Sequence, residues 1–168
     1  MFLVNGKSSD FATNWENYQE YLQSIQGRLP DSARDFALSH WHYDFEDHRC
    51  PHDAWLESVA IREPAQGERK EFRQIEIRIA LLGAYHDGNI EIFYPQVANY
   101  HIVRGFDSST RGKKIGHGDW LTDEVRLTDA GRVIHEIEFE KGIWVIEAGD
   151  IEYRWKPFSV PKKQGQIT

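Results

Sequence analysis

The chain has 168 residues and a formal net charge of −7, from 20 Lys and Arg against 27 Asp and Glu. This length fits a single domain, and 6 Trp, 7 Tyr and 9 Phe are too many for a disordered acidic chain. No apolar run approaches the roughly 18 residues of a membrane span, and the N-terminal sequence lacks the basic flank of a signal peptide. The single cysteine cannot form an internal disulfide. We therefore expect a cytoplasmic protein with no membrane contact, and its acidic balance argues against general nucleic-acid binding.

Two helices are predicted at the start of the chain. Thr13 and Glu16 have the spacing of a capping box, and apolar or aromatic residues follow at helical intervals as far as Ile25. Gly27 suits the end of the first helix, and a second capping pattern follows shortly after it. The helical part should span about residues 12–40 and cover another part of the fold with its aromatic side chains.

From Ala54 onward, the period of the apolar residues changes from 3.6 to 2, which is typical of antiparallel strands with one solvated face. No long helix separates these strands, so parallel crossovers are not expected. The predicted class is α+β, with N-terminal helices packed on a twisted antiparallel β-sheet or a half-open barrel. The β part covers about residues 54–157, within a single domain over 1–157 that is followed by a flexible tail at 158–168.

The β part contains a weak internal repeat. Residues 52–56 match 117–121 at an offset of 65, and residues 87–92 resemble 141–146 at an offset of 54. A true duplication would give two related β-units, each a strand followed by a hairpin, with the first histidine of each repeat at an equivalent strand entrance. The alternative is that two β-units of similar composition look alike by chance.

The densest polar cluster lies in residues 40–53, which hold four His, the only Cys and four carboxylates. Imidazole, thiolate and carboxylate groups are ligands of zinc and other transition metals. One hypothesis is therefore a metal-dependent hydrolase in which the metal activates water. Its candidate ligands are His42, Asp44, His48, Cys50 and His52. Their spacing matches no established metal motif, and the alternative is a connecting loop pinned by hydrogen bonds between histidines and carboxylates.

Other catalytic chemistry has little support in the sequence. There is no nucleophile-elbow motif and no glycine-rich phosphate-binding loop, so no catalytic residue is nominated. His135 lies on the apolar face of its strand, where a buried, hydrogen-bonded histidine is the commoner explanation. A further hypothesis is a small-ligand-binding half-barrel whose mouth is lined by aromatic residues and His135.

The run HDAWLESVAI at residues 52–61 begins a resemblance to known proteins. Alternating isoleucines follow, then the pattern DGxIxIF at 87–93 and the segment 97–100. Over about residues 52–103, the chain resembles a group of small bacterial β-rich proteins, some of which are similar to immunity proteins of polymorphic toxin systems. The resemblance rests on structural elements and carries over no catalytic residue, but it implies a protein that acts by binding another protein.

The leading prediction is thus a non-catalytic, immunity-like protein-interaction domain without a cofactor. An acidic surface suits a basic partner, such as a nuclease toxin, through electrostatic steering. Bulky aromatic anchors combined with charged side chains are common at the centre of interfaces. The candidate contact residues are Trp41, Tyr43, Asp44, Asp47, Trp55 and Trp120. The sequence leaves the oligomeric state open, although a free strand edge could support dimerisation.

Overall fold

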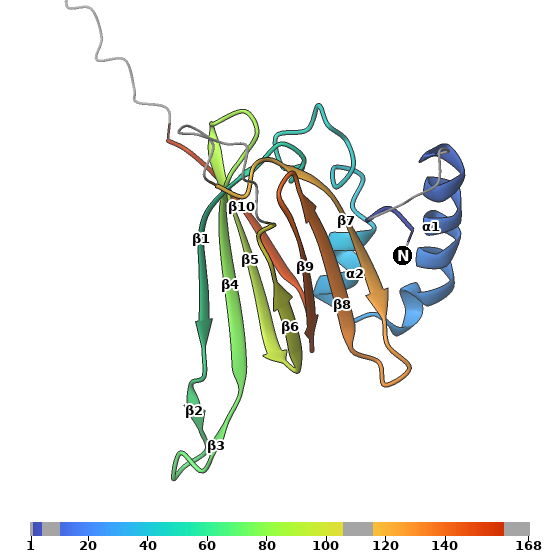
Figure 1. The fold of residues 1–168 in the computed structure, drawn as a ribbon. Helices are drawn as coiled ribbons and strands as arrows, with labels where there is room; N and C mark the ends of the chain where they lie inside the picture. The colour runs from blue at the N-terminus through green and yellow to red at the C-terminus, as the bar shows by residue number, and fades with distance from the viewer. Residues whose placement is uncertain (1, 5–10, 106–115, 160–168) are drawn as a thin grey trace, which may run out of the picture.

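A computed structural model describes residues 2–4, 11–105 and 116–159. In these residues the helices are α1 (Phe11–Ile25), the 3₁₀ turn η1 (Gln26–Arg28) and α2 (Asp31–Ala37). The strands are β1 (Trp55–Arg62), β2 (Ala65–Gln66), β3 (Phe72–Arg73), β4 (Ile75–Leu82), β5 (Gly88–Val97), β6 (Asn99–Ile102), β7 (Trp120–Leu127), β8 (Val133–Phe139), β9 (Gly142–Ala148) and β10 (Glu152–Pro157). The predicted α+β class is confirmed, with antiparallel sheets that do not close into a barrel (Figure 1). No helix in the described ranges is long and apolar enough to cross a membrane.

Two four-stranded antiparallel sheets are joined by two bent strands. One sheet has the order β1-β4-β5-β10 and the other the order β6-β9-β8-β7. β5 runs into β6 across Ala98, and β9 leads into β10 after Gly149, so each pair of strands contributes to both sheets. At the two bends, the Ala98 N–H donates to the Glu147 carbonyl and the Gly149 N–H donates to the Pro95 carbonyl. The result is one strongly bent layer with β1 and β7 as its outer edges, and a short β2–β3 hairpin extends it beyond β1 and β4 (Figure 1).

The strand order is symmetric about the bent strands. β1, β4 and β5 form one meander, β7, β8 and β9 form a second, and the bent strands of the two meanders pair with each other. The two matched segments of the sequence repeat lie at the openings of β1 and β7, and those of the second match lie at the openings of β5 and β9. β1 and β7 also each have an irregular pairing near their start, at Glu57 and at Leu121, one position apart in the repeat. The topology has the pseudo-symmetry that a duplication predicts, whereas a common origin of the two units stays a prediction.

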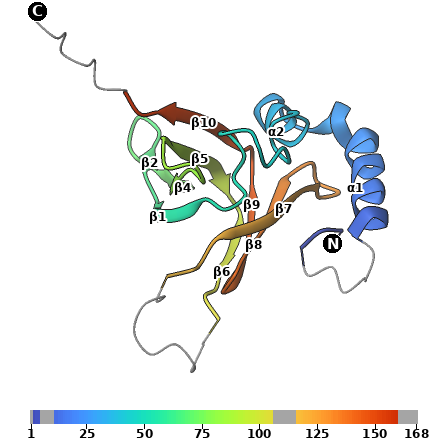
Figure 2. The same cartoon turned by 90° about the horizontal axis from the view of Figure 1, so that it is seen from above.

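The edge strands β1 and β7 meet at one end only. Trp55 and Asp119 form an isolated bridge, and the Asp53 and Trp120 N–H groups donate to the carbonyls of Trp120 and Ala54. Away from this end, β7 runs toward the helices and separates from β1 (Figure 2). The segments that open the two meanders therefore lie side by side and close one end of the layer.

Helix α1 covers the free edge of β7. Figure 2 shows α2 between β10 and β7 and α1 beyond β7. The Tyr18 hydroxyl accepts a hydrogen bond from the Val125 N–H at 2.6 Å, and the Tyr21 hydroxyl accepts one from the Leu127 N–H at 2.9 Å. These bonds satisfy edge N–H groups that would otherwise be open to pairing with another strand.

The hydrophobic core lies between the bent layer and the helices. Phe36 of α2 packs against Trp41, His42 and Tyr153, and so connects the helical part to β10. The largest fully buried side chains come from both sheets and both helices: Tyr18, Phe36, Ile77, Ile79, Leu81, Ile90, Ile92, Tyr94, Trp120, Ile137, Phe139 and Trp144. One continuous buried cluster therefore runs through the helices and both sheets.

Local details differ from the predicted signals at the helix ends and at one turn. α1 begins at Phe11, so Thr13 lies inside the helix rather than before it, and Gly27 lies in η1 without a positive φ. In the turn from β4 to β5, the residue with positive φ is His86 at 56° rather than the Asp-Gly pair that follows it. Most of the predicted tail lies outside the described residues.

Replacement of Tyr18 with Phe should lower the free energy of unfolding by about 1–3 kcal/mol, because the buried Val125 N–H loses its acceptor. Urea unfolding followed by tryptophan fluorescence measures the difference. Tyr100→Phe, at an exposed tyrosine of β6, serves as the control and should leave stability unchanged. Equal stability of Tyr18→Phe and the parent protein would contradict the role of this hydroxyl at the edge of β7.

Candidate functional site

One buried carboxylate connects the segment before β1 to both sheets. Asp123 on β7 is buried, and its Oδ2 accepts hydrogen bonds from His42 Nε2 and His135 Nε2, both at 2.9 Å. Its Oδ1 accepts a hydrogen bond from Trp120 Nε1 at 3.2 Å. His135 Nδ1 lies 2.7 Å from the Tyr94 hydroxyl on β5. We call these five residues the Asp123 node.

The hydrogen bonds of the Asp123 node determine its protonation. His42 Nδ1 lies 3.1 Å from the Phe36 carbonyl, which can only accept, and His42 Nε2 faces the Asp123 carboxylate. Both ring nitrogens of His42 therefore donate, which makes it an imidazolium beside the ionised carboxylate. Burial alone would raise the pKa of Asp123, but the charge of His42 and the hydrogen bonds from His135 and His42 hold that pKa well below its usual range. His135 Nε2 also faces the Asp123 carboxylate, and its Nδ1 lies beside the Tyr94 hydroxyl.

The His42–Asp123 ion pair of the Asp123 node lies within the core, where its role is structural. The side chains of His42, Asp123 and His135 are 1 %, 2 % and 0 % exposed, which leaves no approach for a substrate. Burial also raises the pKa of Tyr94 well above its ordinary value, so its hydroxyl stays protonated. The predicted half-barrel mouth lined by His135 is therefore corrected: this histidine joins β8 to β7 and β5 inside the core.

A second buried polar group holds the start of the chain. Glu124 Oε2 accepts hydrogen bonds from the N–H groups of Phe2 and Leu3, both at 2.7 Å. Arg126 lies between Glu124 and Glu136, with nitrogen–oxygen distances of 3.0 Å and 2.5 Å. The single guanidinium of Arg126 therefore bridges two carboxylates and compensates one of their two negative charges.

The segment between α2 and β1 coils through a series of turns. Backbone hydrogen bonds close these turns one after another between residues 39 and 54. Asp44 Oδ1 accepts from the Glu46 N–H at 3.1 Å, and Asp47 Oδ1 accepts from the Arg49 N–H at 2.9 Å. Short polar side chains commonly stabilise turns in this way. Much of the polar density of the 40–53 cluster thus serves the local backbone.

The five predicted metal ligands each have a separate partner. His42 belongs to the Asp123 node, and His48 Nδ1 lies 2.5 Å from Asp87 Oδ2. Cys50 Sγ and His52 Nδ1 donate to backbone carbonyls at 3.0 Å and 2.8 Å. In the part of the chain that the structure describes, no three His, Cys, Asp or Glu side chains are grouped so that they could hold a metal ion. The successive turns point these side chains in different directions, so the predicted set His42, Asp44, His48, Cys50 and His52 does not form a common centre.

Exposed aromatic side chains gather where three parts of the chain meet. Phe45 in the coiled segment, Trp55 at the start of β1 and Tyr85 in the β4–β5 turn are 55 %, 50 % and 48 % exposed. Histidines from the same three parts of the chain lie among them. The aromatic–histidine patch comprises Phe45, His48, His52, Trp55, Tyr85 and His86.

Ring stacking orders the aromatic–histidine patch. Phe45 stacks on His52 with ring centroids 4.0 Å apart, and Tyr85 stacks on His48 at 4.2 Å. Trp55 packs edge-on against the third histidine at 4.6 Å. The Tyr85 hydroxyl also donates to the Phe45 carbonyl at 3.1 Å, which links the β4–β5 turn to the coiled segment. The exposed rings are therefore held in place before any partner binds.

Carboxylates border the aromatic–histidine patch. The exposed acidic side chains next to it are Asp44, Glu46, Asp53 and Asp87. Arg49, a basic residue of the same coiled segment, is already paired with Asp47, and its hydrogen bond lowers the pKa of that carboxyl to about 2. The patch thus presents aromatic faces in acidic surroundings, a combination that favours cationic groups through charge attraction and cation–π contact.

The six predicted contact residues have different positions in the fold. Asp44 and Trp55 lie on the surface at the aromatic–histidine patch. Trp120 and Trp41 are only 0 % and 9 % exposed, so the fold buries these two rings, and their contact with a partner stays a prediction. The remaining two predicted residues have partners within the fold: Tyr43, which is half-buried, donates to the Asp123 carbonyl at 3.1 Å, and Asp47 binds Arg49.

The contact residues predicted from the sequence do not include Phe45, Tyr85 or His86. Phe45 lies inside the polar cluster of residues 40–53, and Tyr85 and His86 directly precede the Asp-Gly pair at 87–88. Aromatic residues in turn sequences were the available clue, because turns lie on the surface.

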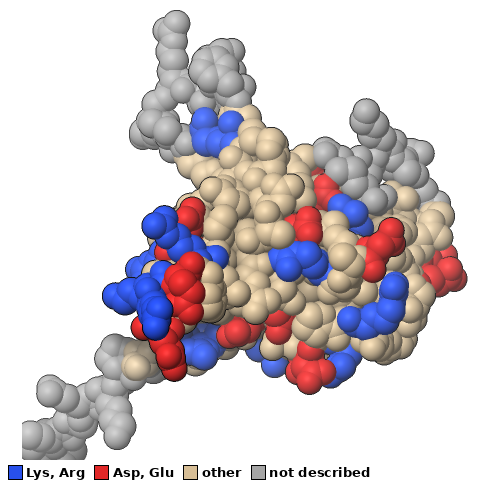
Figure 3. All heavy atoms as spheres, turned by 90° about the horizontal axis from the view of Figure 1, so that it is seen from below, with Lys and Arg blue, Asp and Glu red and all other residues tan. Residues whose placement is uncertain are grey.

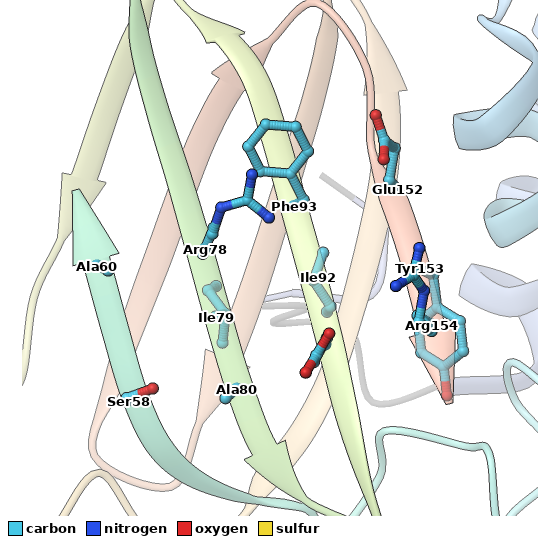
Figure 4. A pocket seen from close by; sticks show the side chains of 11 residues that line it. Ser58, Ala60, Arg78, Ile79, Ala80, Ile92, Phe93, Glu152, Tyr153 and Arg154 are labelled. Carbon is cyan, nitrogen blue, oxygen red and sulfur yellow. The ribbon is translucent and has the colours of Figure 1, made fainter. Parts of the chain in front are cut away.

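A hollow lies on the face of the β1-β4-β5-β10 sheet that points away from the core (Figure 4). It has a volume of about 420 Å³ and includes the small residues Ser58, Ala60 and Ala80. At its border the Arg78 guanidinium lies over the Phe93 ring, 3.9 Å from the centroid. Acidic and basic side chains both line the hollow, and Figure 3 shows the same mixture of signs at the lower end of the molecule. Neither surface has the acidic border that distinguishes the aromatic–histidine patch.

Replacement of Asp123 with Asn should lower the free energy of unfolding by about 3–5 kcal/mol, because the buried imidazolium of His42 loses its counter-charge. The lowered pKa of Asp123 means that its ionised form stabilises the fold above the unfolded-state pKa of about 3.9, and that this stability is lost as the pH falls below that value. Denaturant unfolding between about pH 3 and pH 7 measures the free energy of unfolding, which should fall more steeply with decreasing pH in the parent than in the variant. The control Asp129→Asn, at an exposed carboxylate of the β7–β8 turn, should show the same pH dependence of stability as the parent. The same pH dependence in the Asp123→Asn variant would contradict the ion pair.

The Cys50 thiol should react slowly with thiol reagents in the native protein. Burial raises its pKa to about 12, so little thiolate is present at neutral pH, and the side chain is buried beneath the coiled segment. Labelling at about pH 8 should be at least about a hundredfold slower in the native than in the guanidinium-unfolded protein. Similar rates in the two states would contradict this placement and would reopen a nucleophilic role.

No protein-family model matches the chain, and comparisons with curated proteins and with solved structures found no significant match. The function of this chain is therefore inferred from the chemistry and geometry of its own residues.

Proposed function

We propose that this chain is a non-catalytic binding domain that presents the aromatic–histidine patch to a basic protein partner, as an immunity protein does to its toxin. The observation that carries this proposal is the gathering of Phe45, Trp55 and Tyr85 on one surface, each about half exposed or more. A group of exposed aromatic rings is typical of an interaction site, whereas single exposed rings occur on any protein surface.

The order within the aromatic–histidine patch supports binding rather than turnover. Stacking on histidines fixes the rings, so association loses less side-chain entropy than it would with mobile rings. The His48–Asp87 pair has the form of a base and its orienting carboxylate. A nucleophile would complete such a site, but no described Ser, Thr or Cys is hydrogen-bonded to His48, and Cys50 is buried.

The negative charge of the aromatic–histidine patch border and of the whole chain favours a basic partner. The border of the aromatic–histidine patch is acidic, and the whole chain carries a formal charge of −7. Carboxylates around aromatic faces attract and hold Arg and Lys side chains, and the negative field accelerates the encounter with a basic protein. Binding should accordingly weaken as salt screens the charges.

Affinity capture with a patch variant tests the proposal. The immobilised parent and a Trp55→Ala/Tyr85→Ala variant are compared on extracts of the source cells, and captured proteins are quantified by mass spectrometry. A basic partner should be retained by the parent and reduced at least about tenfold on the variant, because central aromatic anchors dominate interface energies. Its retention should also fall as the salt concentration rises.

A matched control separates loss of the aromatic–histidine patch from a general loss of aromatic surface. The control variant Phe72→Ala/Tyr100→Ala removes two exposed aromatic residues on β3 and β6, outside the patch. This variant should retain as much of the partner as the parent does. Thermal unfolding of all three proteins shows that each is folded. Retention of the partner by the patch variant, or equal loss from both variants, would contradict the proposal.

A further inference from the structure

Each exposed ring of the aromatic–histidine patch is in contact with its own histidine. Phe45 and Tyr85 have stacked histidines at centroid distances of 4.0 Å and 4.2 Å, and Trp55 has His86 at 4.6 Å. Histidine is the side chain whose charge ordinarily changes between about pH 5 and pH 8. The patch is therefore built around three groups whose protonation would change its charge.

His48 can take up a second proton without any rearrangement of its neighbours. Its Nδ1 lies 2.5 Å from Asp87 Oδ2, and because an ionised carboxylate only accepts, Nδ1 donates in the neutral ring. The second proton then binds at Nε2, to which no described residue is hydrogen-bonded, on a side chain that is 52 % exposed. Protonated His48 forms an ion pair with Asp87, so this carboxylate is compensated before any partner arrives.

His52 has a position for its second proton beside another carboxylate. Its Nδ1 donates to the Leu121 carbonyl, so in the neutral ring Nε2 carries the lone pair, and this atom lies 3.5 Å from Asp53 Oδ1. A proton on Nε2 turns this contact between two acceptors into an ion pair. Protonation thus compensates a second carboxylate on the border of the patch.

Protonation also places positive charge against the aromatic rings. The two stacked histidines lie almost parallel to Phe45 and Tyr85, at interplanar angles of 15° and 19°, so each imidazole covers one ring face. An imidazolium there makes the cation–π contact itself and repels a second cation on the other face. His86 brings the same charge to its edge-on contact with Trp55. All three rings then attract Arg and Lys side chains of a partner less strongly.

The other charged groups around the aromatic–histidine patch do not cancel this change. The elements that carry the patch, with the start of β7 that pairs with it, hold these further groups: His40, Asp44, Glu46, Asp47, Arg49, Asp53, Glu57, Asp87 and Asp119. Carboxylates ordinarily stay ionised above about pH 5 and so contribute a constant charge. Arg49 is bound to Asp47, and the end of β10, which packs on the β4–β5 turn, has its Lys156 bound to Glu91. Protonation of His40, which lies 3.5 Å from the Arg49 guanidinium, would add charge of the same sign.

We propose that the aromatic–histidine patch is a proton-controlled site, which binds cationic side chains of its partner at neutral pH and releases them when its three histidines are protonated. This inference rests on the proposed function and adds the condition under which the partner is bound. By linkage, a bound cation must also oppose the protonation of these histidines. The fold itself tolerates this pH range, because the stability that Asp123 contributes is lost only below about pH 4.

Fluorescence quenching measures the change of charge in the absence of any partner. Trp55 is half exposed, and its signal is obtained as the difference between the parent and Trp55→Phe. From about pH 7.5 to about pH 5.5 at constant ionic strength, the ratio of the Stern–Volmer constants for iodide and caesium should rise at least about twofold, because the patch becomes less negative. The ratio removes any change in the excited-state lifetime. The lifetime-corrected constant for neutral acrylamide, which reports access alone, should not change.

Replacement of the three patch histidines tests whether they cause this change. The triple variant His48→Gln/His52→Gln/His86→Gln should abolish the rise in the iodide-to-caesium ratio, because glutamine does not titrate. His101→Gln, at an exposed histidine of β6 outside the patch, is the matched control and should keep the parent's rise. Thermal unfolding at both pH values shows that each variant is folded.

Binding of a defined cation tests the proton control of binding. The probe is a fluorescently labelled, amidated oligo-arginine peptide, since arginine keeps its charge at every pH used. Its dissociation constant for the parent, measured by fluorescence anisotropy, should rise at least about tenfold from about pH 7.5 to about pH 5.5. For the triple variant the two constants should agree within about twofold, whatever its affinity at neutral pH.

Two results would overturn the proton control. The first is an iodide-to-caesium ratio that does not change with pH in the parent, or that changes equally in the triple variant. The second is an affinity for oligo-arginine that is the same at both pH values, and this result would leave the proposed function intact. A peptide that binds at neither pH would instead contradict the proposed function, and the proton control with it.

Discussion

The arrangement of the whole molecule depends on the buried carboxylate of Asp123. An ionised carboxylate in a core is costly unless charge and hydrogen bonds compensate it, and here His42, His135 and Trp120 supply both. His42 comes from the coiled segment and His135 from β8, and His135 contacts Tyr94 of β5. One charge thus ties the irregular segment to both sheets. The position of the aromatic–histidine patch follows from this connection, because Phe45, His48 and His52 all belong to the anchored segment.

Equivalent residues of the two similar meanders differ in their burial. Trp55 and Trp120 occupy equivalent places at the start of β1 and β7, yet the first is half exposed in the aromatic–histidine patch and the second is fully buried at Asp123. The helices contribute to the difference, since α1 packs on β7, and α2 packs on β7 and β10. The free edge of β7 is therefore covered, and Trp120 at its start is buried. The other half is left with an exposed aromatic ring and an open edge.

Much of the fold was predictable from local patterns. Alternating apolar residues marked β4, β5, β8 and β10, and the step from helical to two-residue period near Ala54 located the start of the β part. The apolar row of β8 also predicted a buried His135. These predictions hold because burial of one strand face requires apolar residues at every second position. The candidate site was harder to predict. Of the predicted contact residues, Asp44 and Trp55 are exposed whereas Trp41 and Trp120 are buried, because residue type alone does not separate an exposed anchor from a core ring.

The sequence by itself determined the α+β class, the antiparallel strands and the dense polar segment before β1, because each depends on residues that are close together in the chain. Only the tertiary structure decided which polar groups meet. His42 and Asp123 are 81 positions apart, and Tyr85 reaches Phe45 across 40. The local pattern of apolar residues carries no information about contacts between residues so far apart in the sequence. A histidine near carboxylates in the sequence could equally ligate a metal, stabilise a turn or pair with a buried charge, and long-range packing selected the partner.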